Sequence, residues 1–176
     1  WTDQNGIEES LISAPISIEE EFIPVITLNG TGSVTHEAST EYTDAGATAR
    51  SDDDSEGALT VITTGTVDVN KLGVYTVTYN AQNSSGHEAT PVTRTVTVVD
   101  TTKPVITLNG DVAVTVEAKS VYIDEGATAI DTLDGVLVVA GVSTVNTDVV
   151  GSYTMTYNVS DAAGNAADAV VRTVNV

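Results

Sequence analysis

The chain contains two copies of one sequence unit, and this repeat restricts its fold more than any other feature. Three blocks of the first copy return in the second: 24–30 as 104–110, 42–49 as 122–129, and 73–80 as 151–158. The first block, PVITLNG, is unchanged between the copies, and the offset is 80 residues for the first two blocks and 78 for the third. A repeat of that length is a whole domain rather than one turn of a solenoid. The sequence therefore predicts two small domains that follow a non-repeating N-terminal segment.

Apolar and polar residues alternate through most of each copy. In residues 75–81 the odd positions are bulky or apolar and the even positions are polar, and residues 153–160 repeat this pattern. Such alternation is typical of a strand with one face in the core. About seven short strands separated by turn residues are typical of a β-sandwich. We therefore expect an all-β fold of two tandem immunoglobulin-like β-sandwiches with an N-terminal β-strand arm, in which Tyr75 and Tyr153 occupy the positions of tyrosine corners.

The repeat also sets the expected domain boundaries. We expect an N-terminal arm at 1–22, a first immunoglobulin-like domain at 23–99, a short linker at 100–104 and a second immunoglobulin-like domain at 105–176. Because the linker has few residues and ends in a proline, it should be stiff rather than a flexible tether.

Several motifs of the second copy resemble those of a known family. They are the string DTTKPVITLNG at 100–110, the pattern Tyr-x-Asp-x-Gly at 122–126, the Asp-Gly pair at 134–135, the Gly-x-Tyr at 151–153 and the string SDAAGN at 160–165. Together they resemble the bacterial immunoglobulin-like repeat of the HYR-like type. The resemblance covers residues 23–176 and implies spacer or adhesive modules of surface and secreted proteins, with no catalytic motif to carry over.

The charge of the chain limits its partners. Its 25 acidic and 6 basic residues give a net charge of −19. Nucleic-acid binding needs clustered Lys and Arg, so we expect no nucleic-acid partner. No apolar run approaches the length of a membrane helix, so we expect no membrane insertion. Cysteine is absent, and the chain starts at Trp1 without a Met, which suits a processed product located outside the cell or on its surface.

The sequence gives little support for catalysis. Its two histidines, His36 and His87, have no counterpart in the second copy, and no Ser-His-Asp pattern or cysteine nucleophile is present. We therefore predict that the chain is not an enzyme. Arg94 and Arg172 occupy equivalent positions of the two copies, and we expect each to form a structural ion pair.

Calcium is the one cofactor that the residues suggest, because it prefers carboxylate and carbonyl oxygens. The second copy offers four acidic residues at strand ends or in loops, and the linker adds one more: Glu117, Asp131, Asp134, Asp161 and Asp100. The first copy offers a weaker set, in which Asn83 stands at the position of Asp161: Glu37, Asp53 and Glu56. The alternative is that these are solvated acidic loops without an ion.

The N-terminal arm contains an alternating segment with four apolar residues on one face: Ile12, Ala14, Ile16 and Ile18. Such a strand needs a sheet edge. It either adds an edge strand within its own chain or connects to an upstream domain, or else it completes the sheet of a neighbouring copy and so builds a fibre.

Three functions follow from this sequence. The first is a subunit of a surface filament assembled by strand donation from the arm, with copies of itself as partners. The second is a spacer or adhesin pair of modules within a larger secreted or surface protein, with neighbouring domains as partners. The third is a carbohydrate-binding accessory module.

Overall fold

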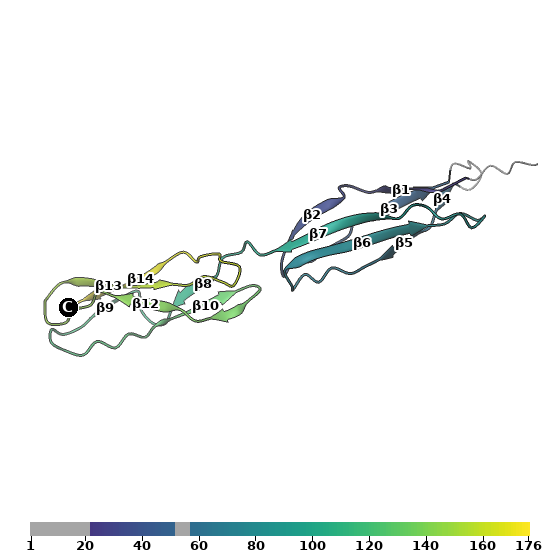
Figure 1. The fold of residues 1–176 in the computed structure, drawn as a ribbon. Coiled ribbons are helices and arrows are strands. Elements are labelled where there is room, and N and C mark those ends of the chain that lie inside the picture. The colour runs from purple at the N-terminus through teal and green to yellow at the C-terminus, as the bar shows by residue number, and fades with distance from the viewer. Residues whose placement is uncertain (1–21, 52–56) are drawn as a thin grey trace, which may run out of the picture.

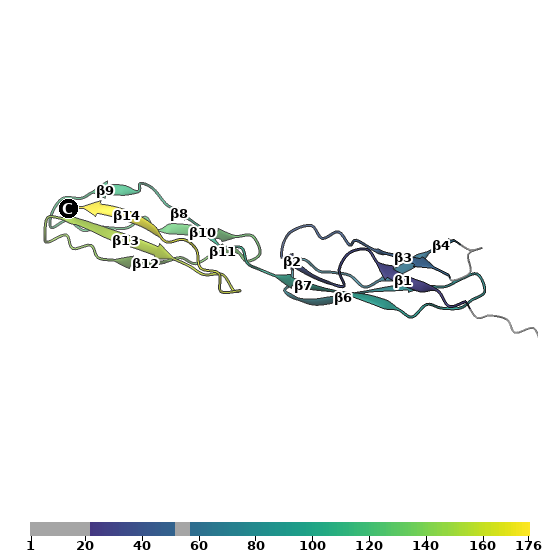
Figure 2. The same ribbon diagram turned by 90° about the horizontal axis from the view of Figure 1, so that it is seen from above.

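The computed structural model describes residues 22–51 and 57–176, which form two β-sandwiches arranged end to end (Figure 1). The described residues contain strands and turns but no helix, so the all-β prediction is confirmed. A view from above shows the same elongated arrangement, with one linker segment joining the two sandwiches (Figure 2). Nowhere in the described residues is there a helix long and apolar enough to cross a membrane.

The described part of domain 1 contains seven strands. They are β1 (Val25–Leu28), β2 (Ser33–Glu37), β3 (Ala47–Arg50), β4 (Ala58–Leu59), β5 (Val61–Thr64), β6 (Gly73–Ala81) and β7 (Val92–Val99). Domain 2 repeats them in the same order. Its strands are β8 (Val105–Leu108), β9 (Ala113–Thr115), β10 (Ala127–Asp131), β11 (Gly135–Leu137), β12 (Ala140–Ser143), β13 (Ser152–Asn158) and β14 (Val170–Asn175).

Both domains have the same topology. In domain 1 a three-stranded sheet of order β1-β3-β4 faces a four-stranded sheet of order β2-β7-β6-β5, and in domain 2 the orders are β8-β10-β11 and β9-β14-β13-β12. The first two strands of each domain lie in different sheets. Strand β2 runs parallel to β7, and β9 runs parallel to β14. Because these strands run in the same direction, the last strand of each domain ends beside the end of the second strand. In domain 1, Glu37 lies beside Val99.

Alternating side chains of the long central strands form the core, as the period-two pattern predicts. In β6 the side chains of Val77, Tyr79 and Ala81 are buried, and Tyr79 has no exposed surface. They pack against Ile26 and Ala49 of the opposite sheet. Domain 2 has an equivalent core cluster around Ile106, Ala129 and Tyr157. Burial of these apolar faces is the main stabilising contribution in domains this small.

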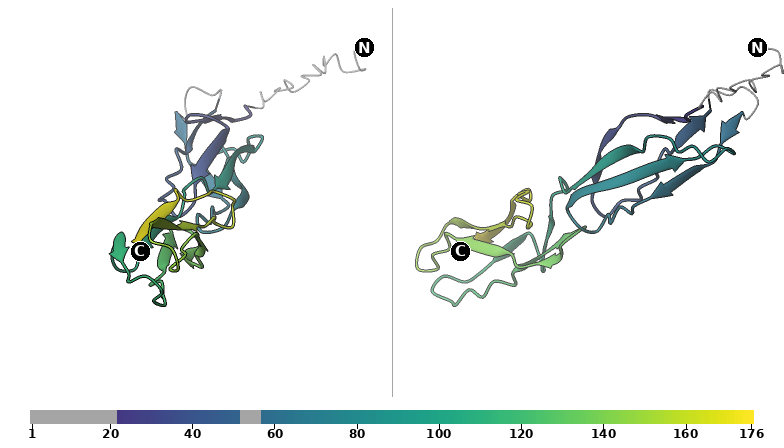
Figure 3. Two further views of the ribbon diagram at one scale, coloured as in Figure 1. Left: turned by 90° about the vertical axis from the view of Figure 1, so that its left-hand side faces the viewer. Right: turned by 45° about the vertical axis from the view of Figure 1, so that its right-hand side comes forward.

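The tyrosine corners form as the Gly-x-Tyr motifs predict. The hydroxyl of Tyr75 donates to the carbonyl of Lys71 at 2.8 Å, and that of Tyr153 donates to the carbonyl of Val149 at 2.8 Å. In each case the phenol reaches back four residues and fixes the loop that precedes the strand. Figure 3 shows the two sandwiches nearly end-on and obliquely.

Candidate functional site at the domain junction

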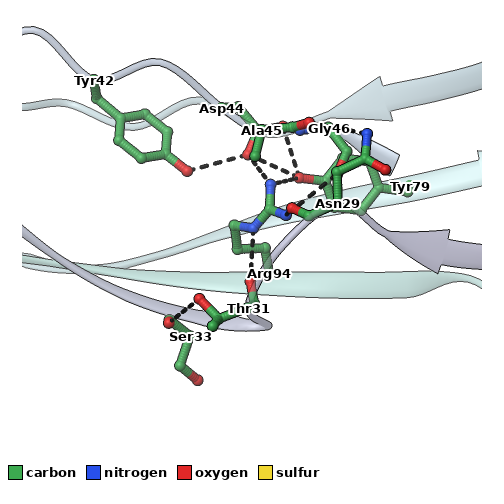
Figure 4. Close-up of polar contacts among 9 residues, drawn as sticks. All are labelled: Asn29, Thr31, Ser33, Tyr42, Asp44, Ala45, Gly46, Tyr79 and Arg94. Atoms are coloured by element: carbon green, nitrogen blue, oxygen red, sulfur yellow. Dashed lines mark hydrogen bonds and ion pairs between the residues drawn. The ribbon is translucent and has the colours of Figure 1, made fainter. Parts of the chain in front are cut away.

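A buried arginine lies at the centre of the most connected polar network of domain 1 (Figure 4). Arg94 of β7 is 1% exposed and forms an ion pair with Asp44. Its guanidinium also donates to the Tyr79 hydroxyl at 2.6 Å and to the carbonyls of Asn29 and Thr31 at 2.6 and 3.0 Å. Arg94 and Tyr79 belong to the four-stranded sheet, while Asn29 and Asp44 lie in the loops that flank β1 and β3. The network therefore ties the two sheets together.

The Tyr-x-Asp-x-Gly motif explains why the carboxylate lies at this place. Asp44 accepts a hydrogen bond from the backbone N–H of Gly46 at 2.9 Å, and the Tyr42 hydroxyl donates to it at 3.1 Å. Gly46 has a φ of +73°, a conformation that glycine adopts without steric cost. This local turn holds the Asp44 carboxylate toward the guanidinium of Arg94.

Domain 2 repeats the network with equivalent residues. Arg172 pairs with Asp124, and Tyr122 and Tyr157 both donate to that carboxylate. Burial raises the pKa of Tyr157 to about 12, and the hydrogen bond to Asp124 acts in the same direction. Burial acts to raise the pKa of Asp124 as well, but the hydrogen bonds from Tyr157, Tyr122 and Arg172 outweigh it and hold this pKa below its ordinary value.

These perturbed groups form a structural network. The guanidinium of each arginine binds groups of its own domain, and the same arrangement occurs in both domains at the junction of the two sheets. The expectation of structural ion pairs for Arg94 and Arg172 is confirmed. The sequence did not identify their partners, although Asp44 and Asp124 are unchanged between the copies.

The linker between the domains is fixed by a carboxylate of domain 1. Glu37, the last residue of β2, accepts four hydrogen bonds from Thr101 and Thr102. Two come from backbone N–H groups, at 2.8 and 3.0 Å, and two from the threonine hydroxyls, at 2.8 and 2.7 Å. The hydrogen bonds from Thr101 and Thr102 lower the pKa of Glu37. This residue was expected in a weak metal site of domain 1, and the structure places it at the linker.

Three of the predicted calcium ligands, one from the linker and two from domain 2, lie close together. Asp100, Asp134 and Asp161 each have an oxygen within 4.8 Å of the others. Asp134 lies in the turn between β10 and β11 and is exposed, and its Oδ2 accepts the N–H of Ala162 at 2.7 Å. Asn165 joins two members of the cluster, because its amide donates to the Asp100 carbonyl at 3.1 Å and to Asp161 Oδ2 at 2.8 Å.

Asp131 adds a fourth carboxylate next to this cluster. It ends β10, is only 3% exposed, and its Oδ1 accepts the backbone N–H groups of Leu133 and Asp134. Its Oδ2 and the Oδ2 of Asp100 are both shielded from solvent and have no hydrogen-bond partner among the described residues. A group of hard oxygen ligands with free, shielded oxygens can hold a divalent cation.

Burial and the neighbouring charges both act on the linker aspartate. Burial raises the pKa of the Asp100 carboxyl above its ordinary value. The negative charges of Asp131 and Asp161, and that of Glu37 across the linker, raise it further. No Lys or Arg of the described residues forms an ion pair with these aspartates. The ion pair of Lys103 with Asp168 lies on the surface.

The remaining predicted residues lie elsewhere. Glu117 follows β9, where the neighbouring Val116 donates to the Asn175 carbonyl, so it lies at the end of domain 2 away from the junction. Asp53 and Glu56 lie outside the described residues. So do the four apolar residues of the arm, Ile12, Ala14, Ile16 and Ile18.

The fold defines the class of protein: a tandem pair of immunoglobulin-like sandwiches. Two segments, 26–98 and 106–176, match the family of the bacterial surface protein Ig-like domain. The chain belongs to this family, with two copies of its domain. The match shows a bacterial immunoglobulin-like tandem repeat and a relation to surface proteins, without singling out the HYR-like type.

Two curated relatives are similar to the chain over part of their length. One is an 81.3 kDa protein of Acholeplasma phage L2, 31% identical over 179 residues, a match that covers 93% of this chain and 23% of the relative. The other is Internalin I of Listeria monocytogenes, 36% identical over 116 residues, covering 62% of this chain and 6% of the relative. The chain thus spans less than a quarter of the length of these relatives.

Two solved structures are also similar. The structure of CBM51-2 in complex with GlcNAc and INT domains from Clostridium perfringens ZmpB has a TM-score of 0.35 and 22% identity, covering 49% of this chain and 20% of that chain. The lipoprotein BT2262 from Bacteroides thetaiotaomicron has a TM-score of 0.36 and 18% identity, covering 85% of this chain and 100% of that chain.

Proposed function

We propose that this chain is a stiff, non-catalytic spacer within a larger bacterial surface protein, and that it holds neighbouring domains at a set distance and angle. The observation that carries this proposal is the linker. Four hydrogen bonds to Glu37 fix the Thr101-Thr102 segment directly where β7 leaves domain 1. Membership of a surface-domain family and the end-to-end arrangement of the two sandwiches support the same function (Figure 1).

The spacer function predicts one narrow distribution of distances between the domains. Because the chain has no cysteine, a cysteine pair for spin labels can be introduced at Ile62 and Val142, two exposed positions on the equivalent strands β5 and β12. Pulsed electron spin resonance should give a single narrow distance for the parent chain. The substitution Glu37→Ala should broaden it, because the linker then loses all four hydrogen bonds.

Glu117→Ala is the matched control for this experiment. Glu117 is the equivalent residue of domain 2, it is exposed, and its side chain makes no hydrogen bond to the described residues. Its removal should leave the distance distribution unchanged. A broad distribution in the parent chain, or equal effects of Glu37→Ala and Glu117→Ala, would refute a stiff junction.

Filament assembly by strand donation is a second hypothesis for the same chain. Its support among the described residues is the set of open sheet edges: β12, for example, pairs only with β13, and all four of its residues are exposed. An open edge can accept a strand from another chain. The donor segment lies outside the described residues, so the test is deletion of residues 1–21 followed by light scattering. Polymers that survive this deletion contradict strand donation.

Carbohydrate binding receives less support from the aromatic residues. All six tyrosines donate their hydroxyls to groups of their own domain, either in the arginine networks or in the tyrosine corners. They are Tyr42, Tyr75, Tyr79, Tyr122, Tyr153 and Tyr157. These contacts favour a role of the tyrosines in the fold over a role in sugar binding.

A further inference from the structure

We propose that Asp100, Asp131, Asp134 and Asp161 bind one calcium ion, which joins the linker to the adjacent loops of domain 2. This inference goes beyond the spacer function, because the ion can bind whether or not the junction serves as a spacer. It rests on the distances between the carboxylates, on two shielded oxygens without a partner, and on the chemistry of the ligand set.

The distances fit a single ion of the size of calcium. Two ligands of one Ca²⁺ ion can be no farther apart than twice the Ca–O distance, about 4.6–5.2 Å. One carboxylate oxygen from each of Asp100, Asp134 and Asp161 meets this limit, because the three atoms lie within 4.8 Å of one another. Asp131 stands outside this group of three and adds its buried carboxylate beside them. For Mg²⁺ the largest distance between two ligand atoms is about 4.1 Å. The carboxylate oxygens would therefore have to lie closer together to bind Mg²⁺ than to bind Ca²⁺.

Two shielded oxygens give an independent reason to expect a cation. Oδ2 of Asp100 and Oδ2 of Asp131 are removed from water without receiving a hydrogen bond. Buried acceptors nearly always have a partner, and a buried unpaired charge is costly. A cation bound among these carboxylates supplies the missing opposite charge to Asp100 and Asp131.

The protein holds these carboxylates in position through their other oxygens. The backbone N–H groups of Leu133 and Asp134 bind Oδ1 of Asp131 at 2.8 and 3.0 Å, and the N–H of Thr102 binds Oδ1 of Asp100 at 3.1 Å. These hydrogen bonds leave Oδ2 of Asp131 and Oδ2 of Asp100 free, whereas Oδ2 of Asp134 and Oδ2 of Asp161 accept hydrogen bonds from Ala162 and Asn165. The ligands therefore need little reorganisation when an ion arrives.

The ligand set selects a hard cation. All four side chains are carboxylates, and neither histidine nor cysteine takes part. Zinc and copper sites usually contain histidine or cysteine ligands, so this set does not favour those metals. The side chain of Asp134 is exposed, so this side of the site is open to water ligands, which Ca²⁺ sites commonly include. We therefore assign calcium rather than a transition metal.

Domain 1 provides a natural contrast. The positions of Asp131 and Asp161 carry Ser51 and Asn83 there, and the Asn83 amide donates to the carbonyl of Phe22 at 2.7 Å. Two of the four carboxylates are thus replaced by neutral groups. Because Asn83 is buried in a folded domain, it also shows that asparagine is compatible with the fold at this position.

The test is a titration of the ¹⁵N-labelled full chain with CaCl₂, followed by amide chemical shifts. We expect saturable shifts confined to 100–102, 131–135 and 161–165, with a Kd of about 10⁻⁴–10⁻³ M, the range of extracellular calcium modules. MgCl₂ should bind at least about tenfold more weakly, because it loses its water reluctantly.

Two variants make the test specific. Asp161→Asn introduces the residue that domain 1 carries, and it should weaken calcium binding at least about tenfold, because affinity depends on the number of charged ligands. Asp148→Asn removes the same charge from an exposed loop of domain 2 and should leave the Kd unchanged. The spectra also show whether each variant is folded.

Three results would overturn the proposal: no shifts up to about 10 mM CaCl₂, shifts scattered over the acidic surface, or equal effects of the two variants. Failure here is distinct from failure of the spacer function. The titration reports binding at the aspartates, whereas the spin-label distances report the linker contacts of Glu37.

Discussion

Replacement of the buried Arg94 by methionine should destabilise domain 1 far more than any surface change. The substitution removes the guanidinium but keeps much of the apolar volume of the side chain. It leaves the Asp44 carboxylate, 23% exposed, without its ion-pair partner. It also leaves the carbonyls of Asn29 and Thr31 without their donor.

The magnitude follows from these losses. Removal of one partner from a buried ion pair costs about 3–5 kcal/mol. Asp44 keeps its hydrogen bonds from Tyr42, Tyr79 and Gly46. The expected loss of stability therefore lies near the lower limit of this range, about 3 kcal/mol. In a domain of this size, 1 kcal/mol shifts the Tm by about 4–8 °C. We therefore expect the Tm of domain 1 to fall by at least about 12 °C.

Differential scanning calorimetry of the full chain measures this effect. Domain 2 keeps its own network around Arg172 and serves as an internal reference. Arg50→Met is the matched control, because Arg50 is exposed on β3 and loses the same charge, so its effect should stay within about 0.5 kcal/mol. Equal shifts for Arg94→Met and Arg50→Met would refute the view that the network supports the fold.

A double-mutant cycle separates the ion pair from the other contacts. Asp44→Asn alone leaves the guanidinium of Arg94 buried without a counter-charge, so it should also be strongly destabilising. The double variant removes both charges and should cost less than the sum of the single variants. Additive effects would mean that the two charges do not stabilise one another.

Three further predictions concern other parts of the fold. Tyr153→Phe removes the hydrogen bond of the second tyrosine corner and should cost about 1 kcal/mol, measured by urea denaturation; no change would mean that the corner is not stabilising. Because the pKa of Tyr79 and that of Tyr157 are raised to about 12, their contribution to the free energy of unfolding is complete below pH about 10 and is lost as the pH rises toward about 12. Thermal melts across this range, with tyrosinate absorbance, check the prediction, and phenols that ionise near pH 10 in the folded chain would contradict it. Lys119→Gly should stabilise domain 2 by up to about 1 kcal/mol, because Lys119 has a φ of +65°, a conformation that costs a residue with a side chain about 1–2 kcal/mol. Ser39 has a φ of +57° at the equivalent position of domain 1, and Ser39→Gly should have the same effect there. A lower Tm in both variants would contradict the strain argument.

The strands could be predicted because the signal for them is local. Alternation in 75–81 and 153–159 reflects the two faces of a strand, and any strand that packs one face on a core shows it. The tyrosine corners also follow from a short motif. The partner of Arg94 could not be found in this way, because Asp44 lies 50 residues away in the chain. Contact between them depends on the packing of the two sheets.

The acidic residues show the same limit. Asp131 and Asp134 are close in sequence, and a turn brings them together. Asp161 reaches them only because the loop before β14 packs beside the turn between β10 and β11, where Ala162 bonds to Asp134. The sequence pattern places Glu37 in one candidate metal site with the acidic loop of domain 1. The parallel pairing of β2 with β7 instead places it beside Val99, next to the linker.

The two ends of a domain therefore contribute different residues to a junction. The second strand of domain 1 ends in Glu37, which binds the linker threonines, and the turns at the near end of domain 2 carry the aspartates that face Asp100. Glu117 ends the equivalent segment of domain 2 at the far end of the pair, and its carboxylate makes no hydrogen bond to the described residues. Strands β9 and β14 pair in parallel, as β2 and β7 do. Glu117 therefore occupies in domain 2 the position that Glu37 occupies in domain 1, where Glu37 binds the linker. Domain 2 thus carries the aspartates of one junction and, in Glu117, the carboxylate position of another, whereas domain 1 has Ser51 and Asn83 in place of two of the aspartates.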